Sequence, residues 1–542
     1  MKTNICKFVI MAAVACLGFT ACTGDLDVTP IDPNMTTEVT PSGLFNKCYA
    51  TLAMAGNGQG DDPCDIDGLD GGTSGFIRQY WNSNELTTDE ALCHWSDDGI
   101  QQFCYNTYDS NHPMLNGYYS RLTTGISYCN QYINTFADHD ATMTAEIRLV
   151  RALEYYMLMD AFGNIPFSTT LANPTRMTRK EAYDWIEKEL LDLEPNLSDA
   201  KPKTDADLNN YCRLDKAACW MLLSRLYLNA EVYTGTPQWA KAAEYAKKVM
   251  DSSYKLNTKG SGKWSAYQML FMGDNGSTSA AQEGVWRIYQ DGVSTTSWAG
   301  SLFLMASTFD GNIHADCSGT YPTATNGTGQ TWGGNRARKD LVEKFFPNDD
   351  APNVACTDMP AAAGDDRAIF DGLGRTLDNG NGFKGTFTDG FAVAKFNNFK
   401  TDNSVGKDAN FPETDFFLFR VAEAYLNAAE ALMHLNGEGD GTAKNYLNAL
   451  RNRAHAGEKN SFTLNDVLDE RAREFYFEGQ RRTDLIRFNQ YGGASTYMWD
   501  FKAGAEKGAT FEKYRNVYPI PTTEVMANRN LTQIDGYTQI DN

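Results

Sequence analysis

Paired helical stripes constrain the fold of this chain more than any other feature of its sequence. Ala218, Leu222 and Leu226 recur every four residues, the spacing that places side chains on one face of an α-helix. A partner stripe covers residues 239–250, and the same design returns over residues 421–454. Two helices with a short break between them, and small residues where their backbones approach, are typical of tetratricopeptide-like units. Such units stack to bury their remaining apolar faces, so the sequence predicts a mainly α-helical scaffold of helix pairs.

The stretch from about residue 256 to residue 412 has a different character. Glycine, asparagine, threonine and aromatic residues dominate it, and helical stripes are few. A segment of this length is too long to be a connector. We therefore expect a long irregular, loop-rich insertion that rests on helices in residues 41–255 and 413–542. Together these parts are predicted to form one domain, residues 41–542.

Two further helices are expected from local signals. One begins at Pro41, where the Thr40-Pro41-Ser42 sequence precedes apolar residues at helical spacing. The other covers residues 470–487, where glutamates and arginines alternate at distances that allow them to pair with each other. We interpret these charges as a structural ion-pair network and not as catalytic acids.

The N-terminus predicts export and attachment to a membrane. A short basic segment precedes an apolar run over residues 8–19, which is the pattern of a signal peptide and is shorter than the roughly 20 residues of a spanning helix. The run ends with Thr20 and Ala21 before Cys22, a sequence that resembles the lipobox of bacterial lipoproteins. We predict a signal peptide at residues 1–21, acylation of Cys22 and a flexible tether at residues 22–40. A cleaved signal peptide with a chance cysteine is the alternative.

The charge balance excludes several kinds of partner. The net charge is −21, from 69 acidic against 48 basic residues. Such a surface repels phosphate backbones, so we predict no nucleic-acid partner. It also disfavours adsorption to anionic lipid headgroups, which leaves the acyl chains as the predicted membrane contact.

Cysteine and acidic residues predict no metal site or cofactor. Nine of the 12 cysteines follow Cys22, and an odd number leaves at least one thiol without a partner in the chain. They lack the spacing of metal ligands and are interpreted mostly as small buried hydrophobes. Calcium stays an alternative for the acids in the loop over residues 56–75, although Pro63 breaks the EF-hand order. These acids are Asp61, Asp62, Asp65, Asp67 and Asp70.

Four blocks of sequence, in this order, resemble the SusD/RagB family. The first reads EIRLVRALEYY and DAFGNIP over residues 146–166, and the second reads FLFRVAEAYLNAAE over residues 417–430. The third covers residues 470–487, with ERAREF, EGQRR and DLIR, and the last is YPIP at residues 518–521. The resemblance spans the chain from about residue 40 to its end, behind the lipobox. No single block is specific, but the four in order are.

The resemblance implies a function as well as a fold. Members of this family are surface lipoproteins of the outer membrane of Bacteroidetes, and they are not enzymes. They capture oligosaccharides or polysaccharides and deliver them to a SusC-like, TonB-dependent transporter for nutrient uptake. Their fold combines tetratricopeptide-like helix pairs with an irregular glycan-binding region, which agrees with the division of this sequence into two helical stretches and a loop-rich one.

Two other functions are considered. Tetratricopeptide grooves usually hold peptides, so the chain could be a protein-binding scaffold, with the helices facing a partner while the loops hold sugar. A glycoside hydrolase of helical fold would need two carboxylates about 5–9 Å apart. The sequence contains no GxSxG, HExxH or phosphate-loop motif, and we predict that the chain is not an enzyme.

Candidate sugar-binding residues are aromatic side chains close to polar ones in loops. Sugar rings stack their C–H faces on aromatic rings, which bury a large apolar area, while acids, amides and arginines bond the hydroxyl groups. Trp95 is the leading candidate in the first part of the chain. Its neighbours in the prediction are Arg78, Trp81, Asp97 and Asp98. The loop-rich region contributes Tyr289, Trp298, Tyr321, Trp332, Arg336 and Arg338.

Overall fold

The computed structural model describes residues 39–311, 326–493 and 496–539. The chain divides into two units, Met1–Leu44 and Phe45–Asn542. The predicted signal peptide, Cys22 and nearly all of the predicted tether lie outside the described residues. In the first unit the structure describes residues 39–44, which contain the start of α2 (Pro41–Ala53), the helix expected to begin at Pro41. The rest of this description concerns the second unit.

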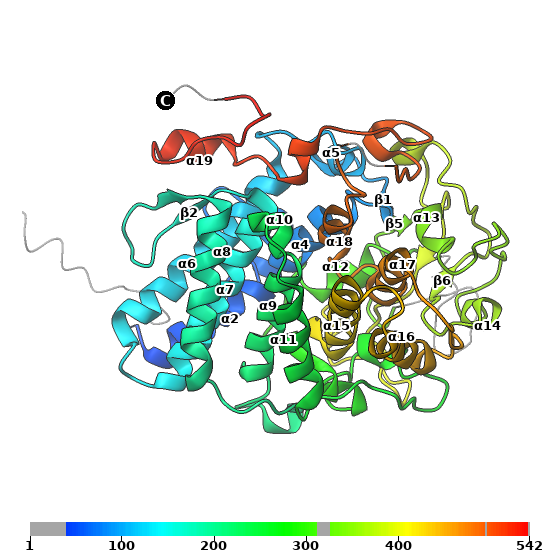
Figure 1. The fold of residues 1–542 in the computed structure, drawn as a ribbon, viewed down its shortest axis with the longest axis horizontal. Helices are drawn as coiled ribbons and strands as arrows, with labels where there is room; N and C mark the ends of the chain where they lie inside the picture. The colour runs from blue at the N-terminus through cyan, green and yellow to red at the C-terminus, as the bar shows by residue number, and fades with distance from the viewer. Residues whose placement is uncertain (1–38, 312–325, 494–495, 540–542) are drawn as a thin grey trace, which may run out of the picture. The chain divides into compact units, whose positions relative to one another are not determined.

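Antiparallel helix pairs form the scaffold (Figure 1). Neighbouring helices pack in succession, with α6 against α7, α9 against α11, α11 against α15, and α15 against α16. The long helices are α6 (Pro113–Phe136), α7 (Ala141–Phe162), α8 (Arg179–Leu193), α9 (Lys216–Leu228), α11 (Trp239–Asp251), α15 (Val421–Asn436) and α16 (Gly441–Arg453). The two stripe pairs read from the sequence are thus α9 with α11 and α15 with α16. Mainly helical structure built of helix pairs is confirmed.

Polar residues at the helix starts explain where these helices begin. The Thr178 hydroxyl accepts a hydrogen bond from the backbone N–H of Glu181, and the Glu181 carboxylate accepts one from the backbone N–H of Thr178, which completes a capping box for α8. Asp140 and Asp440 accept hydrogen bonds from backbone N–H groups in the first turns of α7 and α16. Local sequence therefore sets the register in which the apolar stripes meet.

The first helical stretch also carries short elements around a two-stranded pairing. These elements are η1 (Gln59–Asp61), α3 (Gly71–Ser74), α4 (Phe76–Glu85), β1 (Ala91–Cys93) and α5 (Ile100–Cys104). β1 pairs in antiparallel register with β5 (Asn335–Ala337), so that Cys93 lies opposite Asn335. This pairing joins two segments that are about 240 residues apart in the sequence.

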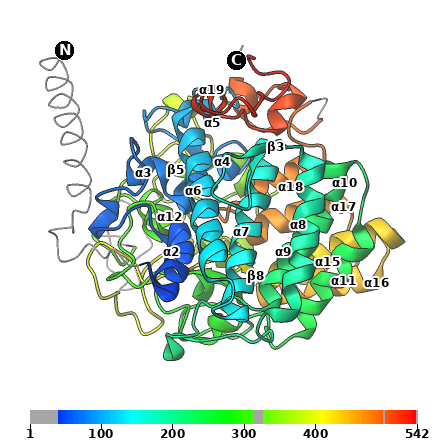
Figure 2. The ribbon, with the colours of Figure 1, turned by 90° about the vertical axis from the view of Figure 1, so that its left-hand side faces the viewer.

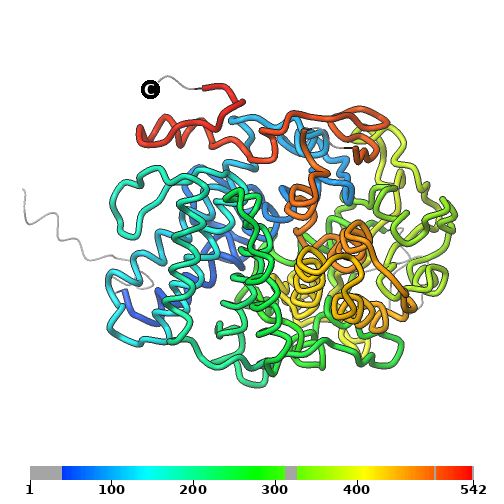
Figure 3. The backbone as a smooth tube through the Cα atoms, viewed as in Figure 1, coloured from blue at the N-terminus to red at the C-terminus, as the bar shows by residue number. Residues whose placement is uncertain are grey.

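The loop-rich region contains short helices and strands. They are η4 (Gln268–Phe271), η5 (Ser279–Gln282), β4 (Gly284–Ile288), α12 (Ser301–Ala306), β5, α13 (Lys339–Val342), α14 (Met359–Ala363), β6 (Phe370–Asp371), η6 (Gly382–Lys384) and β7 (Ala392–Val393). β4 pairs with β8 (Phe416–Arg420), the strand that leads into α15. Figure 3 shows the irregular course of this backbone beside the helices. The β4–β8 pairing fixes the loop-rich region to the scaffold.

The remaining elements are short. Between α7 and α11 lie β2 (Ile165–Phe167), β3 (Thr175–Met177), η2 (Glu194–Asn196), η3 (Asp205–Asp207) and α10 (Ala230–Thr234). The last part of the chain forms η7 (Lys502–Gly504), η8 (Lys513–Asn516) and α19 (Thr522–Ala527), and Figure 2 shows α19 at the same end of the molecule as the C-terminus. None of the helices in the described ranges has the length and apolar character needed to cross a membrane.

The prediction of one helix over residues 470–487 is wrong. The segment forms two helices, α17 (Leu464–Phe475) and α18 (Arg481–Arg487). Phe477 and Gly479 between them have φ values of 64° and 80°, which a continuing right-handed helix does not allow. A Cβ atom on Gly479 would lie 2.3 Å from the ring of Tyr80. The break therefore brings the backbone close to α4.

The charges of this segment do form a buried network, as predicted. Arg420 and Arg453 both donate to the carboxylate of Glu474 on α17, and Arg367 from the loop-rich region donates to it at 3.2 Å. All four side chains are buried. Burial alone would raise the pKa of Glu474, but Arg453, Arg420 and Arg367 hold it well below its ordinary value. This carboxylate is an anchor that ties three segments together.

A second set of buried pairs joins segments that are far apart in the sequence. Arg481 on α18 donates two hydrogen bonds of 2.7 Å to Asp89, which lies 392 residues earlier. The backbone N–H of Gly479 donates to Glu85 at the end of α4. Buried acids of the first helices are thus paired by groups near the C-terminal end of the chain.

The cysteines show the packing expected of small hydrophobes. Six of the eight cysteines in the described ranges are buried. Cys64 and Cys212 are half-buried. Cys317 lies outside the described residues.

Candidate functional site

Three of the predicted tryptophans meet in one surface hollow. The hollow has a volume of about 360 Å³ and is lined by Arg78, Trp95, Asp97, Trp298 and Trp332. All five residues were predicted from the sequence as sugar contacts. They come from α4, from the end of β1 and from two places in the loop-rich region. We call the three indole rings of Trp95, Trp298 and Trp332 the tryptophan platform.

The rings of the platform follow one another at nearly equal spacing. The centroids of Trp95 and Trp332 are 6.4 Å apart, and those of Trp332 and Trp298 are 6.3 Å apart. Successive ring planes are tilted by 54° and 44°. Trp298 is 37% exposed, and the other two rings are half-buried. The platform is therefore a bent row of aromatic surfaces that are partly open to solvent.

Strand pairing and a close approach position Trp95. The β1–β5 register places Trp95 beside the residues that precede β5, and its indole N–H donates to the carbonyl of Gly333 at 2.8 Å. A Cβ atom on Gly334 would lie 2.2 Å from the indole ring. Only glycine leaves room for the ring at this point.

Loops that pack on one another position the other two rings. The backbone N–H of Trp298 donates to the buried carboxylate of Asp61 at 3.0 Å, and the Trp298 ring lies 4.9 Å from Phe411. The indole N–H of Trp332 donates to the amide of Gln330 at 3.0 Å. These contacts hold the platform in place without a ligand.

Arg78 supplies one unpaired hydrogen-bond donor beside the platform. Its guanidinium carbon lies 5.8 Å from the centroid of Trp95 and 5.1 Å from that of Phe303, within the range of cation–π contacts. Its Nε atom is buried and has no hydrogen-bond partner. Burial lowers the pKa of Arg78, and the nearby Asp97 opposes this shift. An unpaired buried donor is costly, and a ligand hydroxyl in the hollow would remove this cost.

Three of the predicted contacts are buried in packing roles, so the structure does not support them. Trp81 is 1% exposed and packs edge-on against Phe303 and Phe477. Arg336 and Arg338 are fully buried. Their guanidinium groups donate to backbone carbonyls, those of Asp389 and Gly382 for Arg336 and those of Ala91, Cys104 and Asp500 for Arg338. Irregular backbone leaves carbonyl groups without a ladder partner, and these arginines satisfy them.

The remaining predicted residues lie elsewhere. Tyr289 is half-buried and lines a different hollow. Asp98 is exposed but does not line the platform. Tyr321 lies outside the described residues. Sequence reasoning missed Asp61, Gln330 and Phe411, which hold the platform, because nothing in the sequence shows that they lie close to it.

Two of the acids for which calcium was the alternative make other contacts. Asp61 accepts hydrogen bonds from Ala55, Ser297 and Trp298, and Asp65 pairs with Arg121 and Lys47. Within the described ranges, no group of three or more histidine, cysteine, aspartate or glutamate side chains is arranged to hold a metal ion.

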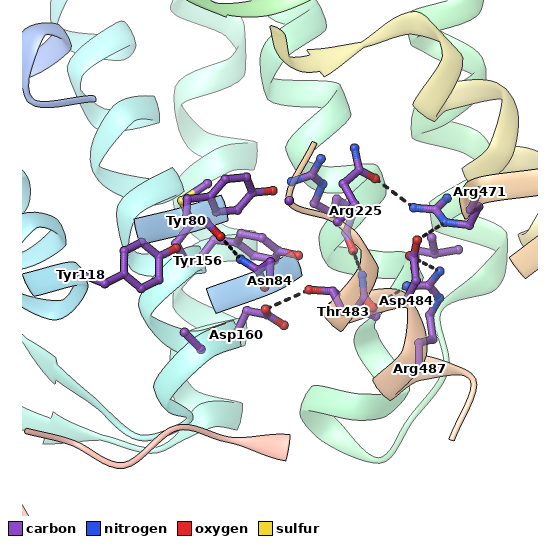
Figure 4. Close-up of a pocket in the computed structure, with 16 residues that line it drawn as sticks. Tyr80, Asn84, Tyr118, Tyr156, Asp160, Arg225, Arg471, Thr483, Asp484 and Arg487 are labelled. Atoms are coloured by element: carbon purple, nitrogen blue, oxygen red, sulfur yellow. Dashed lines mark hydrogen bonds and ion pairs between the residues drawn. The ribbon is translucent and has the colours of Figure 1, made fainter. Parts of the chain in front are cut away.

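A buried polar cavity lies between the helices but is too small for a sugar (Figure 4). Its volume is about 30 Å³, enough for about two water molecules. Asp160 accepts a hydrogen bond from Thr483 at 3.0 Å, and Asp484 pairs with Arg471 and Arg487 on the opposite side. Its lining belongs to the charged core of the protein.

Two family profiles and several known proteins match this chain. A profile of the SusD family matches residues 374–537, and a profile described as "Starch-binding associating with outer membrane" matches residues 74–228. The starch-binding protein SusD of Bacteroides thetaiotaomicron is 37% identical over 583 aligned positions, which cover 99% of this chain and 100% of that protein. The chain belongs to the SusD family. A more distant relative, SusD-like protein P2 of Formosa agariphila, is 23% identical over 462 residues and matches 78% of this chain.

Solved SusD-like structures share the fold. Surface glycan-binding protein A from Bacteroides uniformis superposes with a TM-score of 0.65 at 20% identity, over 91% of this chain and 98% of its own. Surface glycan-binding protein A from Bacteroides thetaiotaomicron, solved with laminarihexaose, gives 0.64 at 18% identity over 91% of this chain and 98% of its own. SusD-family proteins bind carbohydrate and are not catalytic, so the expectation that this chain is not an enzyme is confirmed.

Proposed function

We propose that this SusD-family protein binds a glycan on the tryptophan platform at the cell surface and delivers it to a TonB-dependent transporter. The observation that carries the proposal is the bent row of three partly exposed indole rings beside the unpaired donor of Arg78. The rings offer stacking surface to the C–H faces of sugars. Arg78 and the exposed Asp97 offer partners for the hydroxyl groups at the edge of the same hollow.

Stacking supplies most of the expected affinity. Hydrogen bonds between sugar hydroxyls and the protein replace bonds to water, and each contributes only about 0.5–1.5 kcal/mol net. The three indole rings bury apolar area against the sugar, and this burial is favourable because it replaces no hydrogen bond to water. A transporter partner must also be able to take the glycan away. We therefore expect dissociation constants between about 1 μM and 1 mM, or about −8 to −4 kcal/mol.

The geometry favours a curved glycan. A flat ribbon of sugars needs rings in one plane, whereas the ring planes here turn by 54° and then by 44°. The α-1,4-linked glucan of starch curves in this way. The relative that aligns over its whole length is named a starch-binding protein, so we propose a starch-type α-glucan as the ligand.

The N-terminal sequence and the family support a site of action at the outer membrane. The profile that matches residues 74–228 describes proteins that associate with the outer membrane. We propose that acyl chains on Cys22 hold the protein at that membrane and that the predicted tether, residues 22–40, lets it reach the transporter. The partner and the anchor are parts of the same proposal.

Calorimetry with maltoheptaose tests the binding site. We expect Trp95→Ala, Trp298→Ala and Trp332→Ala each to weaken binding at least about tenfold, or 1.4 kcal/mol, because each removes a stacking surface. Trp239→Ala is the matched control, because the Trp239 ring stacks on His434 on the helical scaffold, with centroids 4.1 Å apart. This variant should bind maltoheptaose like the wild type. If all three platform variants keep wild-type affinity and melting temperature, the site lies elsewhere.

A further inference from the structure

A second hollow lies close to the platform. It has a volume of about 550 Å³ and is lined by residues of α2 within the second unit, by residues 208–213 and by residues 286–295. Tyr289 presents a half-buried ring to it, and the Leu208 side chain at its rim is 67% exposed. We call this the tyrosine hollow.

Three polar side chains that line the hollow with Tyr289 have no hydrogen-bond partner among the described residues. Asn46, Asn209 and Ser294 line the hollow with exposed side chains. None of these three side chains makes a hydrogen bond to another described residue, and the hydroxyl of Tyr289 is also unpaired there. An aromatic face among free amides and hydroxyls has the chemistry that a sugar requires.

The floor of the hollow is preformed. Tyr211 lies edge-on to Tyr289 with centroids 5.8 Å apart, and its hydroxyl donates to Asp415. The guanidinium of Arg287 lies 5.0 Å from the Tyr211 centroid and donates to the carbonyls of Gly284, Lys203 and Ala281. Since these groups are already paired, Tyr289 keeps its position whether or not a ligand is bound.

One short backbone segment connects the two hollows. Thr295 lines the tyrosine hollow and Trp298 lines the platform. At no more than 3.6 Å per residue, their Cα atoms lie within about 11 Å of each other. Asp61 clamps this segment by accepting from Ser297 and Trp298 at 2.8 and 3.0 Å. The segment between the two hollows is therefore short and held in place.

We propose that the tyrosine hollow is a second subsite for the same glycan chain, with Tyr289 as its stacking residue. The proposal rests on the platform being the primary site. A chain that lies on Trp298 continues past residues 295–297 and places a further sugar on Tyr289. Long glycans then bind more tightly than short ones, because one molecule occupies both hollows.

Calorimetry with two ligand lengths tests the second subsite. The probes are maltotriose and a long linear maltodextrin, and the variant is Tyr289→Ala in the full chain. We expect an affinity for maltodextrin about tenfold lower than that of the wild type and an unchanged affinity for maltotriose. Leu208→Asp is a second variant with the same expectation, and its exposed position makes loss of folding a poor explanation. Equal effects on the two ligands, or none, would overturn the proposal.

Two further measurements separate the possible failures. Trp298→Ala should bind both ligands at least about tenfold more weakly. If Trp298→Ala binds both ligands with wild-type affinity, the proposed platform is wrong. If Trp298→Ala binds weakly but Tyr289→Ala binds both ligands like the wild type, only the second subsite is wrong. Hydroxyl-radical footprinting should show that maltodextrin protects Tyr289 and that maltotriose does not. Protection of Tyr289 without any glycan would mean that a protein segment fills the hollow, and this would also overturn the proposal.

Discussion

Replacing Glu474 with glutamine should destabilise the protein without changing its glycan site. The Glu474 carboxylate is fully buried and accepts from Arg453, Arg420 and Arg367. Glutamine keeps the size of the side chain but removes its charge and adds two N–H donors that face three guanidinium groups. No residue of the tryptophan platform contacts this network.

The structure allows the magnitude to be worked out. Removing one partner from a buried ion pair costs about 3–5 kcal/mol, because it leaves a buried charge uncompensated. Here each arginine keeps another carboxylate. Arg420 keeps Glu478 and Glu283, Arg453 keeps Glu283, and Arg367 keeps Asp365 and Glu470. We therefore expect a loss near the lower end of the range, about 3 kcal/mol in the free energy of unfolding.

Urea unfolding followed by tryptophan fluorescence measures this loss as a lower midpoint. Asp469→Asn is the matched control on the same helix. Asp469 is 40% exposed and pairs with Lys344 at 2.9 Å, so its loss should cost less than about 1 kcal/mol. A midpoint for Glu474→Gln equal to that of Asp469→Asn would refute the anchoring role. A variant that keeps its midpoint but no longer binds glycan would show that the network belongs to the binding site.

Three further predictions concern the platform, pH and the anchor. Gly334→Ala should weaken maltoheptaose binding at least tenfold in calorimetry, because its Cβ would lie 2.2 Å from the Trp95 ring. Gly439→Ala is the control and should bind like the wild type, because no atom lies within 4 Å of its added Cβ. Burial raises the pKa of Glu90 from 4.5 to about 7, so the unfolded chain releases this proton first as the pH rises. The folded protein therefore loses stability as the pH rises from about 4.5 to 7. Thermal melts recorded across that range should show a smaller fall in melting temperature for Glu90→Gln than for the wild type. Cys22→Ala should move the protein from the detergent phase to the aqueous phase in a detergent-partitioning assay, and unchanged partitioning would argue against acylation.

Local patterns predicted the scaffold because its helices are specified by nearby residues. The stripe at Ala218, Leu222 and Leu226 lies on α9 as expected. The break in the predicted 470–487 helix escaped this reasoning because it depends on a distant contact. Gly479 takes a positive φ where the chain passes against Tyr80, a neighbour about 400 residues away in the sequence.

The candidate site was predictable in residue type but not in residue position. Tryptophans next to polar residues in loops pointed to Trp95, Trp298 and Trp332. The β1–β5 pairing brings Trp95 beside Trp332, and the sequence does not show this pairing. The same reasoning selected Arg336 and Arg338 because an arginine near an aromatic suits a sugar. It could not show that carbonyl groups of the surrounding loops already accept from them.

The pairing of Asp89 with Arg481 has a consequence for how the polypeptide is made. Synthesis proceeds from the N-terminus, so Asp89 emerges long before its arginine, which lies 392 residues later. Until that arginine appears, packing around Asp89 would bury an unpaired charge, which costs several kcal/mol. The first helices therefore cannot complete their native packing on a nascent chain. A ribosome that stops before residue 481 should release a fragment that proteases degrade readily, because its first helices lack the partner of Asp89.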